Sequence, residues 1–351
     1  MKILYVKSRD STFIRLDEEI LENHFAVIKF HIRSKGRIQY ILSIIALSLF
    51  LPVKLLSVNV VFTRFADWHT ALLAFFCGVY KRKLIIVVGG YDVAKMPEYN
   101  YGAFTSKFRG WCVRYSLRNA HYLLPNNPCL IDYTNTYAFS EPRKGGIRHF
   151  APDIKGIIRV IHNGYKTDFW TFDRNTQKEN IALTVAYIRD YRFYRLKGID
   201  DFIEVARRIP DYKFIVIGLS EKKAREFNLS LPDNLLLIPE MNQEKLREFY
   251  RKAKVFCLFS VTEGMPNVLC EAMLCNCIPV CSDIIFMPEL VGGAGFINSR
   301  KDISVMIENV QKAFDSNEEL GIKARRRIVE NFSLERREKE LVELFENLTQ
   351  T

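Results

Sequence analysis

Two glutamates, Glu263 and Glu271, are the residues of this chain whose type and spacing point most directly to chemistry. They stand in the segment V-T-E-G-M-P-N-V-L-C-E-A-M, between the apolar runs 255–259 and 278–281. A carboxylate between two core elements costs free energy unless a polar partner satisfies it. The segment therefore predicts a binding site for a polar ligand.

The residues between the two glutamates predict the start of a helix at that site. Gly264 permits close backbone approach, and Pro266 suits the first helical turn. The backbone N–H groups of Asn267, Val268 and Leu269 would then present the positive end of the helix dipole, which binds phosphate. The two carboxylates would flank that phosphate and accept hydrogen bonds from hydroxyl groups on either side of it. A ligand in the order sugar, diphosphate, ribose matches this arrangement.

A second segment supplies positive charge. Lys197-Gly198 precedes an amphipathic helical pattern, and three arginines crowd the residues before it: Arg189, Arg192 and Arg195. Beside a diphosphate these cations would stabilise the leaving group as it departs. The alternative is that they are solvated surface charges. At this point both interpretations stay open for Lys197 and the three arginines.

Short apolar strands alternate with helical segments throughout the 351 residues, which predicts parallel sheets with helices on both faces. We expect two doubly wound domains, one in residues 1–162 and one in 163–330, followed by a helix in 331–351 that closes on the first domain. The ligand would bind in the cleft between the carboxyl ends of their strands. The ten strands that we expect are 2–6, 25–30, 59–63, 84–88, 122–125, 181–187, 213–217, 234–238, 255–258 and 279–281.

The basic residues are unevenly distributed. Residues 1–165 contain 23 basic and 11 acidic residues, whereas residues 166–351 contain 28 and 29. The net charge of +11 therefore comes from the first half, which indicates an anionic partner for that half. Residues 104–118 have helical periodicity and place aromatic residues mainly on one face and basic residues on another, as in helices at a membrane surface. An ordinary core-packed helix with a solvated basic face is the alternative.

The apolar run 38–51 is shorter than the roughly 20 residues that cross a bilayer. We interpret it as a buried helix, with a helix at the membrane interface as the alternative. The eight cysteines lack the paired spacing of a zinc site, and the N-terminus does not resemble a signal peptide. These features favour a reduced, cytoplasmic protein.

The glutamate segment resembles the E-x7-E signature of the retaining glycosyltransferases of family 4, which have the GT-B fold of two Rossmann-like domains. The resemblance extends over most of residues 160–300 and includes V-I-H-N-G-Y-K-T-D-F-W, L-K-G-I-D-D-F-I-E-V-A and F-I-V-I-G. It implies a transfer of sugar from a nucleotide-sugar donor to a glycan or lipid-linked acceptor, in the synthesis of a cell-surface polysaccharide or glycolipid. Since no Asp-x-Asp occurs, no metal or other cofactor is expected.

The resemblance also implies roles for individual residues. Glu263 would bind the donor sugar and Glu271 the ribose. Lys197 would hold the diphosphate together with an arginine, for which we favour Arg192, while Arg189 and Arg195 stay open. Asn163 is carried over as a donor-binding residue at the domain boundary, and Asp92 as a catalytic residue of the first domain.

The first half departs from the family pattern. Gly89 stands where relatives have a histidine, so the role of that histidine must pass elsewhere. The segment 97–102 is either an acceptor loop or a plain surface turn.

Two other classes of function remain as alternatives. A nucleotide-sugar epimerase or hydrolase could use the same fold. A nucleic-acid binder could use the basic half, but the sequence contains no nucleic-acid-binding motif, and we expect no such partner. We expect the protein to lie in the cytoplasm, in peripheral contact with the anionic inner face of the membrane.

Overall fold

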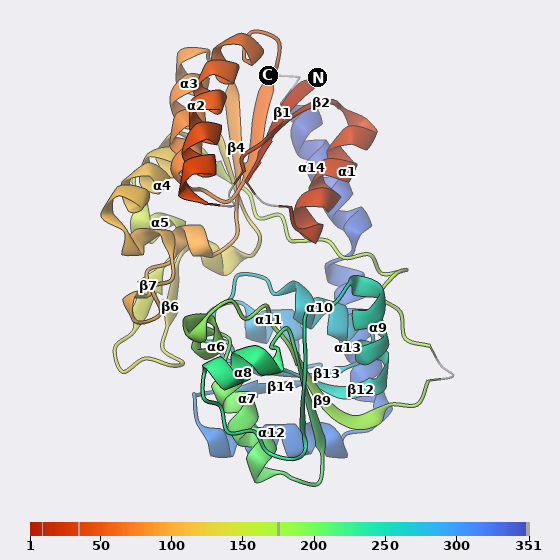
Figure 1. Ribbon diagram of the computed structural model, residues 1–351. Coiled ribbons are helices and arrows are strands. Elements are labelled where there is room, and N and C mark those ends of the chain that lie inside the picture. Colours follow the sequence, from red (N-terminus) through yellow and green to blue (C-terminus); the bar gives the residue numbers. More distant parts are fainter. Residues whose placement is uncertain (9, 34–35, 174–175, 349–351) are drawn as a thin grey trace. The chain divides into compact units, whose positions relative to one another are not determined.

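The computed structural model describes residues 1–8, 10–33, 36–173 and 176–348, and it divides into two compact units (Figure 1). The first unit contains Met1–Thr134, Arg143–Gly164 and Glu335–Thr351, and the second contains Asn135–Pro142 and Tyr165–Leu334. The chain thus passes between the units at Gly164, two residues after the boundary expected from the sequence. The final helix belongs to the first unit.

The first unit contains a six-stranded parallel sheet in the order β2-β1-β3-β4-β5-β8. Its central strands are rich in Val, Ile and Leu and fully buried, because helices cover both faces of the sheet. The strands are β1 (Lys2–Lys7), β2 (Ala26–His31), β3 (Val60–Arg64), β4 (Lys83–Val88), β5 (Tyr122–Pro125) and β8 (Ile157–Ile158). A separate two-stranded sheet pairs β6 (Tyr133–Asn135) with β7 (Arg143–Gly145).

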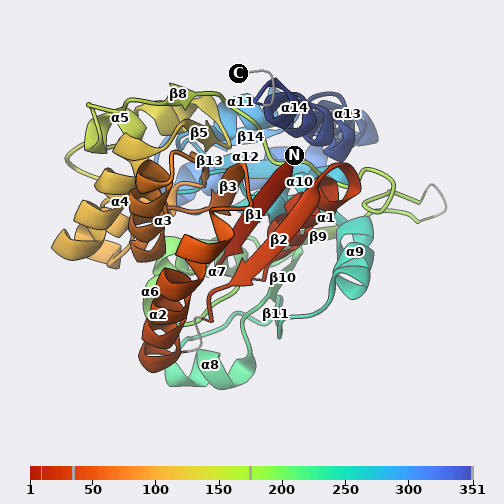
Figure 2. The same cartoon turned by 90° about the horizontal axis from the view of Figure 1, so that it is seen from above.

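The helices of the first unit form two layers. Figures 1 and 2 show α2 (Arg37–Lys54), α3 (Trp68–Val79) and α4 (Lys107–Asn119) side by side, and α1 (Thr12–His24) beside α14 (Leu334–Asn347). Phe345 of α14 packs against Phe62 of β3 at 5.6 Å between ring centroids. The shorter helical segments are η1 (Tyr91–Val93), η2 (Pro97–Tyr99), η3 (Ala103–Thr105), η4 (Pro128–Ile131) and α5 (Ile147–Phe150).

The second unit repeats the plan with a parallel sheet in the order β11-β10-β9-β12-β13-β14. Its strands are β9 (Glu179–Val185), β10 (Lys213–Ile217), β11 (Leu235–Ile238), β12 (Ala253–Leu258), β13 (Ile278–Ser282) and β14 (Phe296–Asn298). Its helices are α6 (Tyr191–Leu196), α7 (Ile199–Arg208), α8 (Glu221–Glu226), α9 (Gln243–Lys252), α10 (Asn267–Leu274), α11 (Met287–Val291), α12 (Ile303–Asp315) and α13 (Glu318–Asn331).

All ten strands expected from the sequence occur, and their ends differ from the expected ones by at most two residues. Four strands of two or three residues each are not expected from the sequence: β6, β7, β8 and β14. Of these, β8 and β14 lie at the edges of the large sheets, and β6 pairs with β7. Runs this short carry no periodicity, so propensity alone cannot identify them.

The interpretation of residues 38–51 as a buried helix is wrong. Helix α2 buries Leu47 and Leu51 against the unit, and Leu55 directly after it is also buried, yet Ile38 and Leu49 are 76% and 72% exposed. No helix in the described ranges is both long and apolar enough to cross a bilayer. Packing on the core therefore does not explain the apolar residues on the exposed side of α2.

A buried ionic network fastens α14 to the first unit. The guanidinium of Arg337 donates two hydrogen bonds to the Asp17 carboxylate on α1, at 2.7 and 2.9 Å, and another to the carbonyl of His162 at 2.6 Å. Arg64 on β3 lies 2.8 Å from the same carboxylate. Asp17 is fully buried and both arginines are 3% exposed, so each charge depends on the others for solvation.

Replacing Arg337 with Met should lower the free energy of unfolding by about 3 kcal/mol, since it leaves part of a buried carboxylate and a carbonyl unsatisfied. Arg336→Met on the same helix is the matched control, because Arg336 makes an exposed pair with Glu340 that is worth about 0.5 kcal/mol. Guanidinium unfolding curves of the two variants measure the difference. Equal curves would show that the network does not stabilise the unit.

Candidate active site

The turn at Lys197-Gly198 joins α6 to α7 and packs against the end of β12. Gly198 has a φ of +63°, and a Cβ added to it would lie 2.1 Å from the carbonyl oxygen of Phe259. The backbone N–H of Val261 also donates to the Leu196 carbonyl at 3.0 Å. Only glycine combines this φ with this close approach. Its presence brings Lys197 to the segment that follows β12.

Lys197 and Glu263 form an ion pair in the second unit. The Lys197 Nζ lies 2.5 Å from Glu263 Oε1, and the hydroxyl of Ser260 donates to the same oxygen at 2.8 Å. The two charged side chains are 26% and 13% exposed, so a ligand can reach them from solvent. The structure thus brings together two of the predicted site residues. It adds Ser260, which no motif in the sequence indicated.

Helix α10 begins directly after this segment, where the sequence predicts it. Pro266 is its N-cap residue, and no side chain caps the helix. The first amides of a helix have no acceptor within it, so Val268 and Leu269 present N–H groups suited to an anion. The side chain of Asn267 accepts a hydrogen bond from the Tyr165 hydroxyl at 3.1 Å. This bond connects the start of α10 to Tyr165, where the segment Tyr165–Leu334 of the second unit begins.

Glu271 lies one turn inside α10 and is 7% exposed. Burial raises the pKa of its carboxyl from 4.5 to about 8, while the nearby Tyr250 hydroxyl acts in the opposite direction. No cation satisfies Glu271 in the described part of the chain. Ionising Glu271 in the ligand-free protein therefore costs free energy, and hydroxyl donors from a ligand would lower this cost.

The three candidate arginines occupy different environments. Arg192 pairs with Asp190 at 3.0 Å, and Arg195 pairs with Asp200 at 3.0 Å. The guanidinium of Arg189 stacks 4.0 Å from the ring centroid of Phe193. The residues predicted as a loop form the short helix α6. The choice among the three as diphosphate ligands stays a prediction.

Asp92 in the first unit is fully buried after β4. Its carboxylate accepts hydrogen bonds from the backbone N–H groups of Ala66, Gly89 and Gly90, at 2.9 to 3.3 Å. Burial raises its pKa to about 6, and these amides oppose the shift. The geometry matches a role in holding the loop. The predicted catalytic role of Asp92 stays a prediction.

The position of the family histidine is closed to a side chain. A Cβ on Gly89 would lie 2.1 Å from Cε1 of Phe65, so the Phe65 ring fills the space that a residue at position 89 would use. Phe65 has a φ of +64°, a left-handed conformation that is rare for a bulky residue. Sequence patterns do not reveal such a conformation, and the sequence analysis missed Phe65 for that reason.

Asn163 lies in the first unit, apart from the donor-binding residues assigned to the second. Its side-chain oxygen accepts a hydrogen bond from Arg64 at 2.8 Å, within the network around Asp17. This contact gives Asn163 a structural role. Its predicted part in donor binding stays a prediction.

The segment predicted as either an acceptor loop or a surface turn is ordered by its backbone. The backbone N–H of Met96 donates to the Tyr101 carbonyl at 2.8 Å, and the N–H of Tyr101 donates to the Met96 carbonyl at 3.0 Å, across the turn at η2. The Tyr91 and Tyr101 rings pack edge to face at 5.2 Å, and Arg109 donates to the Tyr91 hydroxyl at 2.7 Å. Both interpretations of this loop stay open.

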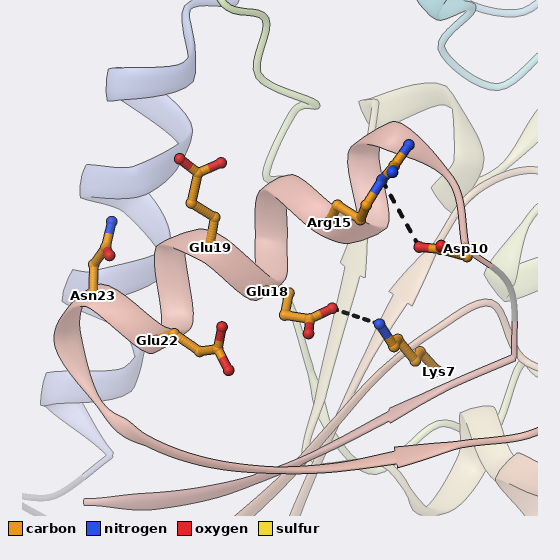
Figure 3. A pocket seen from close by; sticks show the side chains of 7 residues that line it. All are labelled: Lys7, Asp10, Arg15, Glu18, Glu19, Glu22 and Asn23. Atoms are coloured by element: carbon orange, nitrogen blue, oxygen red, sulfur yellow. Dashed lines mark hydrogen bonds and ion pairs between the residues drawn. The ribbon is translucent and has the colours of Figure 1, made fainter.

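A separate pocket in the first unit lies beside α1 (Figure 3). It has a volume of about 390 Å³ and is lined mainly by charged residues. Burial would raise the pKa of Glu18, but hydrogen bonds from Lys29 and Lys7 hold it below its usual value. Glu18 and Glu22 are already paired with lysines and Asp10 with Arg15, so these charges are balanced within the unit.

In the described ranges no three His, Cys, Asp or Glu side chains gather as metal ligands. All eight cysteines are free thiols, and seven of them are buried. Independence from metals stays a prediction.

The second unit is similar to known glycosyltransferases. Residues 168–333 match the family described as "Glycosyl transferases group 1", and this range lies within the second unit, which holds the Lys197–Glu263 pair. An uncharacterized glycosyltransferase of Haemophilus influenzae is 26% identical over 39% of this chain and 40% of its own length. The Campylobacter jejuni GalNAc-alpha-(1->4)-GalNAc-alpha-(1->3)-diNAcBac-PP-undecaprenol alpha-1,4-N-acetyl-D-galactosaminyltransferase is 24% identical over 34% of this chain and 33% of its own length. The chain therefore spans less than half of these curated relatives.

Solved structures define the fold over the whole chain. Sucrose-phosphate synthase from Thermosynechococcus elongatus superposes with a TM-score of 0.76 at 14% identity, covering 100% of this chain and 99% of that one. HepE from Anabaena, in complex with UDP-glucose, gives a TM-score of 0.70 at 12% identity, covering 99% and 100%. The two parallel-sheet units thus have the GT-B fold of glycosyltransferases, as the sequence resemblance predicts.

Gly198→Ala should lower the midpoint of thermal unfolding and loosen the Lys197–Glu263 pair, because the new methyl group would overlap the Phe259 carbonyl. We expect a loss of about 1–3 kcal/mol from strain at a left-handed position. Gly78→Ala on α3 is the control, since a Cβ there meets nothing within 4 Å, and it should stabilise the protein by about 0.5–1 kcal/mol. A Gly198→Ala protein as stable as wild type would contradict the packing argument.

Glu271→Gln should stabilise the ligand-free protein in a pH-dependent way. The folded pKa of about 8 lies above the ordinary 4.5, so the folded state holds the proton more tightly and loses stability as the pH rises from the lower value to the higher. Glutamine has no proton to lose. The variant should match wild type near the lower pKa and exceed it by on the order of a few kcal/mol at pH 8. Unfolding curves over this pH range test the prediction, with the exposed Glu226→Gln as the control.

Proposed function

We propose that this protein is a retaining, metal-independent glycosyltransferase that moves a sugar from a nucleotide-sugar donor to a glycan or lipid-linked acceptor. The observation that carries the proposal is the ion pair between Lys197 and Glu263 at the start of α10. The match of the second unit to group 1 glycosyltransferases and the GT-B fold support it.

The ion pair gives the proposal a physical mechanism for donor binding. A diphosphate at the amino end of α10 would compete with Glu263 for the Lys197 ammonium, because phosphate carries more charge than a carboxylate. The released Glu263 would then accept hydrogen bonds from sugar hydroxyls. Breaking the ion pair would thus free Lys197 for the diphosphate and Glu263 for the sugar. Lys197 would then stabilise the phosphate as it departs.

Glu271 completes the arrangement at the nucleotide end. Its buried carboxyl would accept hydrogen bonds from the ribose hydroxyls, which lowers the cost of its charge and its pKa. We therefore expect nucleotide binding to release a proton near neutral pH. The buried Glu271 carboxyl would thus lower the stability of the ligand-free protein while favouring nucleotide binding, a trade-off that is common at functional sites.

The relatives support the choice of substrates. HepE was solved with UDP-glucose, which makes a UDP-sugar the first donor to test. The Campylobacter relative is named for a PP-undecaprenol substrate, which supports a lipid-linked acceptor. Synthesis of a surface glycan at the inner face of the membrane is the corresponding expectation from the sequence resemblance. An epimerase or hydrolase on the same fold remains the second candidate, but no observation in this structure favours it.

A thermal-shift panel of UDP-, GDP-, ADP- and TDP-sugars tests donor binding. A true donor at a hundredfold excess over its dissociation constant should stabilise the folded protein by about 2.7 kcal/mol. Glu271→Gln should weaken this shift for the free nucleotide as well. Glu263→Gln should retain binding of the nucleotide but lower the rate of transfer by about 10²–10³-fold. If both variants transferred sugar like wild type, the assignment of the two carboxylates would be wrong.

The product distinguishes the candidate reactions. With acceptor present, transfer with retention yields a glycoside with the anomeric configuration of the donor, which NMR reports directly. Release of free sugar at the same rate with and without acceptor would indicate a hydrolase. Conversion of the nucleotide-sugar into its epimer would overturn the proposed transfer.

A further inference from the structure

Helix α2 carries a continuous apolar stripe on its exposed side. Each member is 51 to 76% exposed, and at about 100° per residue all fall within roughly one third of the helix circumference. The members are Ile38, Ile41, Leu42, Ile45, Leu49 and Val53, and Leu56 continues the stripe just after the helix. The buried Leu47, Leu51 and Leu55 lie on the opposite side, so the residues of the stripe do not pack into the core.

The neighbouring helices extend this surface. Phe75 and Val79 on α3 are 53% and 60% exposed, and Phe108 and Trp111 on α4 are 60% and 61% exposed. The rings of Trp68 and Phe108 pack at 5.5 Å and thus join α3 to α4. Figures 1 and 2 show the three helices side by side. We call the exposed apolar side chains of α2, α3 and α4 the apolar face.

The chain that forms the apolar face is strongly basic. Residues 31–131 contain 13 basic and 3 acidic residues, a net charge of 13 − 3 = +10. Two of the basic residues pair with acids outside this range, Arg64 with the buried Asp17 and Arg118 with Asp153, and the remaining excess is still positive. The three acidic side chains are neutralised or enclosed: Asp67 pairs with Arg109, Glu98 pairs with Arg143, and Asp92 is fully buried. The helices α2, α3 and α4 contain no acidic residue at all.

We propose that the apolar face docks on an anionic phospholipid bilayer, with α2 lying in the plane of the interface. Helices that bind in this way combine aliphatic and aromatic residues on one side with basic residues around them. At 18 residues α2 is roughly 27 Å long, so its stripe could insert along its whole length without crossing the membrane. A second copy of the chain is a poor occupant, because two surfaces of the same positive sign repel each other.

Docking in this orientation would place the lipid surface beside a loop of the first unit. Arg109 on α4 pairs with Asp67 at the start of α3, lies 5.4 Å from the Trp68 ring and donates to the Tyr91 hydroxyl. Tyr91 stands next to Asp92, in the loop that follows β4. A membrane-bound acceptor would thus reach the edge of the sheet where the strands end. The inference goes beyond sugar transfer, and vesicle binding reports on it without any donor or acceptor.

Co-sedimentation of the full chain with vesicles tests the proposal. Wild type should bind vesicles that contain phosphatidylglycerol and bind pure phosphatidylcholine much more weakly, with a loss of binding as salt is added. The double variant Ile45→Ser with Leu49→Ser should bind the anionic vesicles at least about tenfold more weakly, since two aliphatic side chains no longer enter the bilayer. Lys107→Glu with Lys81→Glu should also weaken this binding.

Matched variants in the second unit control for a general loss of apolar or basic surface. Leu236 and Ile322 are 54% and 47% exposed, and Leu236→Ser with Ile322→Ser should bind vesicles like wild type. Lys222→Glu with Lys245→Glu is the equivalent charge control. Thermal unfolding at the wild-type midpoint shows that each variant is folded.

Three outcomes would overturn the proposal. The first is that wild type binds neither kind of vesicle, and the second is that the α2 variant binds like wild type. The third is a wild-type dimer that the Ile45→Ser, Leu49→Ser protein cannot form, without vesicle binding, which would assign the face to self-association. Failure of donor binding with intact vesicle binding would instead contradict only the proposed glycosyltransferase function.

Discussion

The first unit depends on one buried carboxylate. Asp17 is fully enclosed, and its charge is tolerable only because Arg64 and Arg337 reach it from elements far apart in the chain. Arg337 also binds the His162 carbonyl, and Arg64 binds Asn163, so the same network holds the segment where the chain leaves the unit. Ordinary apolar packing could have closed the sheet. The ionic network adds directional contacts that specify where α14 must lie.

The second unit shows the opposite treatment of charge. Glu271 is buried without a compensating cation, and Lys197 and Glu263 neutralise each other where solvent can reach them. A structural site would satisfy these groups permanently, as Asp17 is satisfied. Here Gly198 positions Lys197, and α10 begins without a side-chain cap. A ligand with phosphate and hydroxyl groups would supply the acceptors and donors that these groups lack.

The sequence predicts the architecture well because its signals are local. Runs of Val, Ile and Leu mark the buried parallel strands, and Lys197-Gly198 with the two glutamates marks the residues that we predict for the site in the second unit. The sequence does not predict which face of α2 meets solvent, because an apolar run has the same composition whether it packs on a core or on lipid. Nor does it predict the left-handed Phe65 that fills the space at Gly89, or the bond from Arg64 to Asn163. Each of these depends on residues distant in sequence.

The order of the elements along the chain has a consequence for biosynthesis. The second unit is encoded almost without interruption by residues 165–334, whereas the first unit receives α14 only after the second has been made. On the ribosome the first sheet must therefore wait for its covering helix, with the partners of Phe345 and Arg337 still exposed to water. During that interval the nascent first unit is the part of the chain most open to aggregation and most in need of chaperones.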